Sequence, residues 1–133
     1  FSWTEFGMAD EMTTLGGRTV FLCDAAGPRV TREADALDLI GGLWGLEVDW
    51  LVLPTARLGE DFLRLRTGLA GAVIQKFVTY QVRLAIVGDI SAEAEASDAL
   101  RAFVRESNAA RRVWFVPDLA ALEARLTAQP DGT

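Results

Sequence analysis

The chain has 133 residues, half of them hydrophobic, so it can bury one core of ordinary domain size. Its net charge of −6 disfavours sequence-independent binding to nucleic acid or to anionic lipid. With one cysteine and no histidine, the chain cannot form within itself a zinc site built on His or Cys, a Ser-His-Asp triad or a Cys-His pair.

Hydrophobic runs and cysteine use bear on location. The longest apolar runs, such as Leu69–Ile74, are far shorter than the roughly 18–20 residues that cross a bilayer. The N-terminus lacks the basic-then-apolar order of a signal peptide, and Cys23 has no partner for an intrachain disulfide. We therefore expect a cytoplasmic protein that binds neither a membrane nor nucleic acid, with Cys23 as a buried, unreactive thiol.

The ends of the chain differ from the middle. Residues 1–7 hold three aromatic side chains directly before Met8, and we interpret them as a tag, a fused peptide or an extension. Residues 129–133 form a polar tail. Residues 8–128 then make up a single domain.

Four β-rich runs alternate with helical patterns along this domain. The runs are Thr19–Cys23, Val48–Leu53, Arg83–Val87 and Val113–Val116. This alternation predicts an α/β fold with about four strands in a mostly parallel sheet, joined by crossover helices.

The first helix is predicted to begin at Thr31 as its cap and to carry an apolar stripe that ends at Trp44. Gly41 and Gly42 loosen its end. We expect Trp44, like Trp50 and Trp114, to pack in the core or on the sheet.

The second helix follows Pro54, which ends the second strand. A polar Thr67-Gly68 step opens it, and Leu69, Val73 and Phe77 then repeat on one helical face. The free backbone N–H groups at such a helix start favour an anion or a modifiable hydroxyl.

Two further helices complete the pattern. One is predicted to start at Asp89 or Ser91 and to turn Leu100 and Phe103 inward, and the last is capped by Asp118. Loops that follow successive parallel strands emerge at one edge of a sheet, so Asp89 and Ser91 are expected close to Thr67.

The candidate site for a ligand or a partner lies at this edge and consists of Arg64, Arg66, Thr67, Gly68, Asp89 and Ser91. Arginines attract a phosphate or a carboxylate, and Thr67 is a candidate phosphoacceptor. The simpler interpretation is that Thr67, Asp89 and Ser91 cap helices while the arginines are solvated. We assign no catalytic residue, no metal and no cofactor, because Gly68–Gly71 lacks the dinucleotide spacing and no Walker motif occurs.

The order of elements resembles the STAS domain of bacterial anti-anti-sigma factors over about residues 18–127. The segments that carry the likeness are Val20–Leu22, Gly27, Thr31–Leu43, Thr67–Gly68, Leu84–Gly88, Phe103 and Val116–Leu119. In that family an Asp-Ser-Ser-Gly sequence precedes the helix, and a partner kinase phosphorylates the second serine to switch binding. The resemblance places Thr67 at the acceptor position, with Leu65 and Arg66 where the family has Asp and Ser.

Shorter segments resemble more closely a small bacterial family known only as domain of unknown function 4180. They are Arg66–Gly71, Gln75–Phe77, Val87–Ser91 and Phe103–Asn108. This resemblance implies no function.

Three hypotheses follow. The first is a non-enzymatic, STAS-like regulatory module that binds a protein partner or a small anion at the candidate site. The second is an enzyme or small-molecule binder that uses the same edge, with Asp89 as a proton acceptor and the helix start holding an anionic group. The third is a structural homodimer formed through a sheet edge or a Trp-bearing surface.

Overall fold

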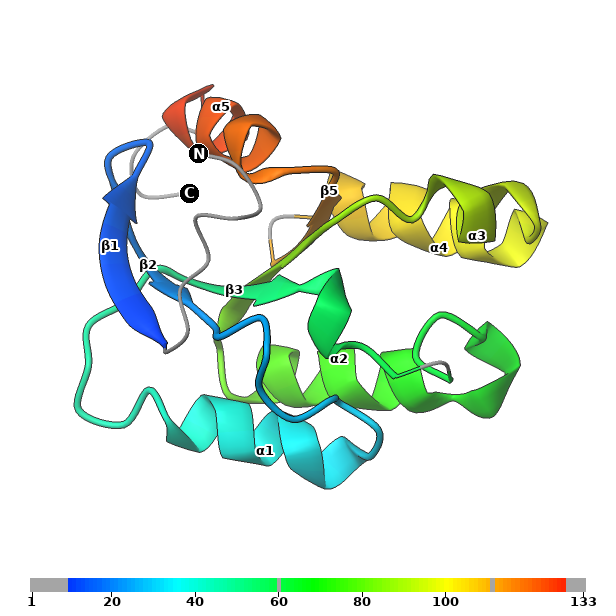
Figure 1. The fold of residues 1–133 in the computed structure, drawn as a ribbon, viewed down its shortest axis with the longest axis horizontal. Coiled ribbons are helices and arrows are strands. Elements are labelled where there is room, and N and C mark those ends of the chain that lie inside the picture. The colour runs from blue at the N-terminus through cyan, green and yellow to red at the C-terminus, as the bar shows by residue number, and fades with distance from the viewer. Residues whose placement is uncertain (1–9, 60, 111, 129–133) are drawn as a thin grey trace.

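The computed structural model describes residues 10–59, 61–110 and 112–128, so the predictions for residues 1–7 and 129–133 fall outside the described residues. A five-stranded sheet runs through the middle of the domain (Figure 1). Its strands, in spatial as well as chain order, are β1 (Glu11–Leu15), β2 (Arg18–Leu22), β3 (Trp50–Pro54), β4 (Arg83–Val87) and β5 (Val113–Val116). β1 is antiparallel to β2 and the other pairs are parallel, which confirms the α/β prediction and adds one strand to the four expected.

The added strand β1 forms a hairpin with β2. The turn contains Gly16 and Gly17, whose φ angles of 57° and 80° suit glycine. A Cβ atom on Gly16 would lie 2.8 Å from Cβ of Leu126, so this turn packs closely against the last helix. Only Leu15 of β1 is buried, which explains why its sequence gives a weak strand signal.

Helices cover both faces of the sheet. The α-helices are α1 (Glu33–Gly41), α2 (Leu69–Thr79), α3 (Ser91–Glu95), α4 (Asp98–Ala109) and α5 (Leu119–Ala128), and two 3-10 helices are η2 (Thr55–Arg57) and η3 (Leu65–Thr67). Side chains of α1, α2 and α4 join one hydrophobic cluster, whereas α5 packs on the opposite face (Figure 1). Right-handed crossovers between strands in sequential order place the connecting helices on one side.

Because both faces are covered, the central strands are apolar throughout. Leu51 and Leu84 point to the cluster under α1 and α2, and Val52 and Ala85 point to the cluster under α5. The predicted inward row of α2 is confirmed, since Val73 and Phe77 are fully buried. Among the described residues, no helix has the length and apolar character needed to span a membrane.

The tryptophans divide between core and surface. Trp50 and Trp114 are buried with ring centroids 4.2 Å apart, and the guanidinium of Arg125 lies 3.9 Å from the Trp114 centroid. The core prediction is confirmed for these two and wrong for Trp44, which is 91% exposed. The first helix ends at Gly41, so Trp44 falls in a turn beyond it and leaves the apolar stripe.

The cap predicted for the first helix is also wrong. Helix α1 begins at Glu33, and the carboxylate of Asp35 accepts the backbone N–H groups of Thr31 (2.9 Å) and Arg32 (3.0 Å). The hydrogen bond from the Thr31 backbone, followed by that from Arg32, keeps the pKa of Asp35 below its ordinary value. Asp118 does cap α5, as predicted, since its Oδ1 accepts from the Ala121 N–H at 2.7 Å.

The single helix predicted after the third parallel strand is two helices, α3 and α4. The Ser97 hydroxyl accepts the N–H of Leu100 at 3.1 Å and starts α4. The Arg101 guanidinium donates to the carbonyls of Ala94 (2.9 Å) and Glu95 (3.2 Å) at the end of α3. These bonds satisfy the polar groups at the break and hold the two helices together.

Candidate functional site

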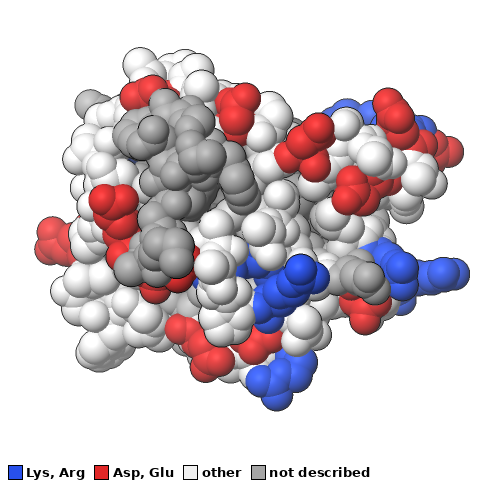
Figure 2. Space-filling view, viewed as in Figure 1, with Lys and Arg blue, Asp and Glu red and all other residues white. Residues whose placement is uncertain are grey.

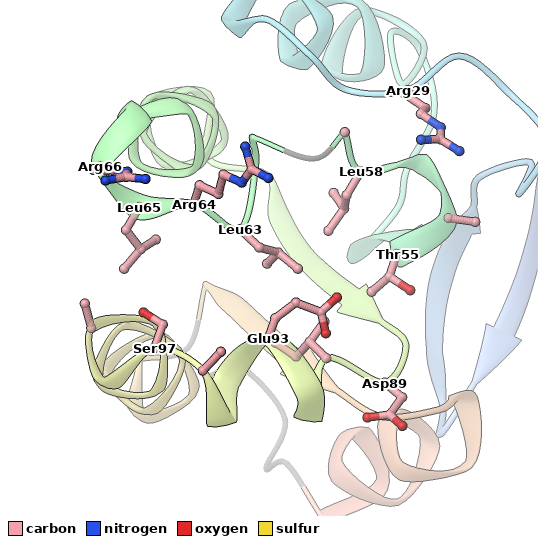
Figure 3. Close-up of a pocket in the computed structure, with 15 residues that line it drawn as sticks. Arg29, Thr55, Leu58, Leu63, Arg64, Leu65, Arg66, Asp89, Glu93 and Ser97 are labelled. Carbon is pink, nitrogen blue, oxygen red and sulfur yellow. The ribbon is translucent and has the colours of Figure 1, made fainter.

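A cleft of about 930 Å³ lies at the carboxyl edge of the sheet. The connection from β3 to α2 forms one wall, and α3 with the first turn of α4 forms the other (Figure 3). The connection from β2 to α1 contributes Arg29 at one end. Loops after three parallel strands thus meet here, in the region where open α/β sheets commonly bind ligands.

One wall is cationic. Arg29, Arg64 and Arg66 all line it, and Figure 3 shows them on the same side of the cleft. Arg64 has an exposed ion pair with Asp61 at 3.8 Å, a length and setting that contribute little energy. Within the described parts of the chain, Arg29 and Arg66 make no hydrogen bond or ion pair, so their guanidinium groups are available to a ligand.

The opposite wall is anionic. Asp89 and Glu93 line it, and the segment from 89 to 98 contains four acidic residues and no basic one. Figure 2 shows the molecule hollowed between a lobe where acidic side chains gather and a lobe where basic side chains gather. The cleft therefore separates opposite charges.

Asp89 itself is anchored by the turn that follows β4. Its Oδ1 accepts the backbone N–H of Ser91 at 2.9 Å. Hydrogen bonds from Ser91, first from its side chain and then from its backbone, lower the pKa of Asp89. A carboxylate so stabilised in its charged form is a weak proton acceptor at neutral pH.

The floor of the cleft is apolar. Leu58 is buried there, and Leu63 and Leu65 are half-buried and point toward α3 and Ser97 (Figure 3). Ile90 adds a further half-buried apolar side chain from the opposite wall. An occupant would bury apolar surface between the two charged walls.

Thr67 and Gly68 lie beside the cleft and do not line it. The Thr67 hydroxyl is 2.9 Å from the carbonyls of Asp61 and Arg64, to one of which it donates, and it accepts the N–H of Leu69 at 3.2 Å. The N-cap of α2 is Gly68, so the cap predicted at Thr67 is one residue too early, and the exposed Thr67 hydroxyl instead satisfies the N–H of the first helical residue from outside the helix. Gly68 has a φ of 79°, which turns η3 into α2.

Of the six residues in the predicted site, the structure brings Arg64, Arg66 and Asp89 onto one cleft, while Thr67, Gly68 and Ser91 shape its walls from outside. Sequence reasoning missed Arg29, Thr55, Glu93 and Ser97, which also line it. The edge rule that was applied to the later strands would have found Arg29, because it follows β2. Glu93 stands one helical turn after Asp89, and the acidic run from 89 to 98 was the available signal.

Arg57 is a second omission, and it is a positioning residue. This buried arginine donates from Nε to the carbonyl of Pro28 and from Nη1 to the carbonyl of Asp24, the latter at 2.8 Å. A Cβ on Gly27 would lie 2.7 Å from the guanidinium carbon, so a larger residue there would displace the Arg57 side chain from the β2–α1 loop. Arg57 thus fixes the loop that carries Arg29.

Close packing also fixes the loop after β4. Gly88 has a φ of 152°, and a Cβ atom there would collide with the side chain of Thr55. A larger residue would push Thr55 into the cleft or separate the two loops. Glycine at position 88 thus allows η2 and the loop that carries Asp89 to meet.

Cys23 and the acidic side chains are the described residues that bear on nucleophilic and metal chemistry. Cys23 is buried, and burial, reinforced by the charge of Asp10, raises its pKa to about 12, so it is a neutral thiol at physiological pH. The prediction of a buried, unreactive cysteine fits this environment. The described parts of the chain contain no group of three or more Cys, Asp or Glu side chains placed to hold a metal ion.

In the comparison with protein-family models, residues 15–126 match the family described as a domain of unknown function, DUF4180. Searches of curated proteins and of solved structures gave no significant match. The matched segment contains the four parallel strands, helices from both layers and every residue that lines the cleft. The chain therefore belongs to the DUF4180 family.

Proposed function

We propose that this protein is a non-enzymatic, STAS-like regulatory module that binds an anionic group of a partner protein in the cleft at the carboxyl edge of its sheet. The observation that carries the proposal is the cationic wall formed by Arg29, Arg64 and Arg66. Arginine recognises carboxylate and phosphate through paired hydrogen bonds, and two of these guanidinium groups have no partner in the described residues.

The chemistry of the cleft favours binding over catalysis. Hydrogen bonds from Ser91 lower the pKa of Asp89, which is the opposite direction from a carboxylate tuned toward neutral pH as a general base. The cysteine thiol lies in the core and is un-ionised. Guanidinium groups held beside an apolar floor suit the binding of a ligand that is released without chemical change.

The STAS-like part of the proposal is supported by the order of elements. The strands and helices from β2 to α5 follow one another in the order for which the sequence resembles a STAS domain. A phosphorylation switch at Thr67 is the second candidate function, favoured by the exposure of Thr67 and its position at the start of α2. A phosphate there would add about −1.5 to −2 charges beside Arg64 and Arg66. It would then compete with an anionic ligand for the same wall.

Chemical-shift titration of the isotope-labelled protein tests the binding proposal. The probes are inorganic phosphate and, separately, N-acetylglutamate amide as a carboxylate. We expect saturable shifts at the side-chain N–H groups of Arg29 and Arg66, with an affinity that falls about fivefold in Arg66→Gln.

The matched control is Arg105→Gln, because Arg105 is an exposed arginine on α4 outside the cleft. This variant should retain the wild-type affinity for both probes. Equal shifts at all arginines, or an affinity that Arg66→Gln leaves unchanged, would overturn the proposal.

A further inference from the structure

The cleft carries both positive and negative side chains, and a simple anion would pair with the positive ones only. Arg29, Arg64 and Arg66 line one wall, and Asp89 and Glu93 line the other. Glu95 adds a further negative charge on α3, whereas Asp98 at the start of α4 forms an ion pair with Arg101. A free phosphate or carboxylate would contact the first wall only and would be repelled by the second.

The two walls do not neutralise one another. No ion pair between described residues crosses the cleft, since the ion pairs there are local: Arg64 with Asp61 on one wall, and Arg101 with Asp98 on the other. Each wall is also held by its own hydrogen bonds, those of Thr67 in the first and those of Ser97 and Arg101 in the second. The opposite charges therefore stay apart and accessible to a ligand.

The space between the walls is large and open to solvent. Its volume of about 930 Å³ lies near the upper end of small-molecule pockets, roughly 300–1,000 Å³. Figure 2 shows this hollow open at the side of the molecule, between the two lobes. The floor of Leu58, Leu63 and Leu65 offers apolar contacts along its length.

We infer that the occupant of the cleft is a peptide segment of a partner protein that carries acidic and basic side chains on opposite sides of an apolar stretch. This inference rests on the proposed function and specifies its ligand. The acidic side chain pairs with Arg66 and its neighbours, the basic side chain pairs with Glu93 and Asp89, and the apolar residues cover Leu63 and Leu65. Nucleotides and other polyanions are disfavoured, because the second wall repels them.

Selection from a display library of random dodecapeptides tests the inference. The library is panned on the full chain and counter-selected on Leu65→Gln, a half-exposed floor position whose variant is checked for folding by circular dichroism. We expect the enriched peptides to share an acidic residue and a basic residue that flank two or three apolar ones. Binding of the best peptide is then measured by fluorescence anisotropy.

Charge reversal supplies the sharper test. Arg66→Glu and Glu93→Arg should each weaken the selected peptide by about tenfold. Replacing the peptide's acidic residue by Lys should restore binding to Arg66→Glu and abolish binding to the wild type. Replacing the peptide's basic residue by Glu should likewise restore binding to Glu93→Arg and abolish binding to the wild type. Arg105→Glu and Glu106→Arg, exposed positions on α4 outside the cleft, should leave binding unchanged.

The outcomes separate the inference from the proposed function. Enrichment of purely acidic peptides, with binding that Glu93→Arg does not weaken, would overturn the inference and leave the anion-binding module intact. Enrichment of no peptide above the Leu65→Gln background would also overturn it. The phosphate and carboxylate titrations then decide the proposed function independently.

Discussion

At the scale of the residue, Gly68 and Gly71 lie three positions apart at the start of α2. Gly68 has a left-handed backbone conformation, whereas Gly71 lies within the right-handed helix. Gly68 has a φ of 79°, which an L-residue adopts only with strain, whereas Gly71 is an exposed position within the helix with open space at its Cβ. We expect Gly68→Ala to lower the free energy of unfolding by about 1 kcal/mol. Gly71→Ala should raise it by about 0.5–1 kcal/mol.

Urea unfolding of the two variants beside the wild type measures both effects. Each variant serves as the control for the other, because both add one methyl group to the same helix. Stabilisation by Gly68→Ala would contradict the left-handed turn into α2, and with it the geometry that brings Arg64 and Arg66 to the cleft.

Single residues also mark how far the sequence could predict the site. Arg64 and Arg66 were identified because they directly precede a recognisable helix start. Arg57 was missed because its importance depends on a contact between loops some thirty positions apart in the chain, which no local pattern announces. Arg29 follows β2, and the rule that loops after parallel strands share one edge would have found it. Trp44 was misjudged for a related reason, since where a helix ends decides whether its last apolar residue reaches the core.

At the scale of the element, the strands were predicted well where both faces are buried. β3, β4 and β5 read as continuous apolar runs, but β1 has a polar, mostly exposed sequence and was found only in the structure. The break between α3 and α4 was missed because Ser97 and Arg101 must act together across it. The apolar periodicity of the sequence continues through this break, and it therefore predicts a single helix.

The start of α1 supports a pH-dependent prediction. The N–H groups of Thr31 and Arg32 hold the pKa of Asp35 below its ordinary value of 3.8. The folded state therefore keeps this carboxylate charged to lower pH than the unfolded state does. Its stabilisation is complete above the unfolded pKa and disappears as the pH falls through the lowered pKa.

We expect Asp35→Asn to lower the free energy of unfolding at pH 7 by about 1 kcal/mol, because it removes a charge-assisted acceptor. Denaturant unfolding from pH 7 down to pH 3 should show that the difference in free energy of unfolding between wild type and variant becomes smaller below about pH 4. The control is Asp38→Asn on the same helix, an exposed position where the change should stay within about 0.5 kcal/mol. A gap that widens on acidification would contradict the assigned capping role.

At the scale of the whole molecule, one sheet separates two hydrophobic clusters. Val73 of α2 lies in one cluster and Leu122 of α5 in the other, and both side chains are fully buried. The central strands β3, β4 and β5 contribute side chains to both clusters, so loss of either layer exposes the strands that the other layer needs. The domain should therefore unfold in a single cooperative transition, even though the two helical layers do not touch through the sheet.

A double-mutant cycle across the sheet tests this architecture. Val73→Ala should cost about 2–3 kcal/mol and Leu122→Ala about 2–5 kcal/mol. Because the two residues share no cluster, the costs should add to within about 0.5 kcal/mol in the double variant. Fluorescence, in which the buried Trp50 and Trp114 on the α5 side change environment more than the exposed Trp44, and far-ultraviolet circular dichroism should give coincident urea transitions for every variant. A separate early transition by fluorescence in Leu122→Ala would mean that the α5 layer unfolds on its own, and would contradict the single cooperative transition expected here.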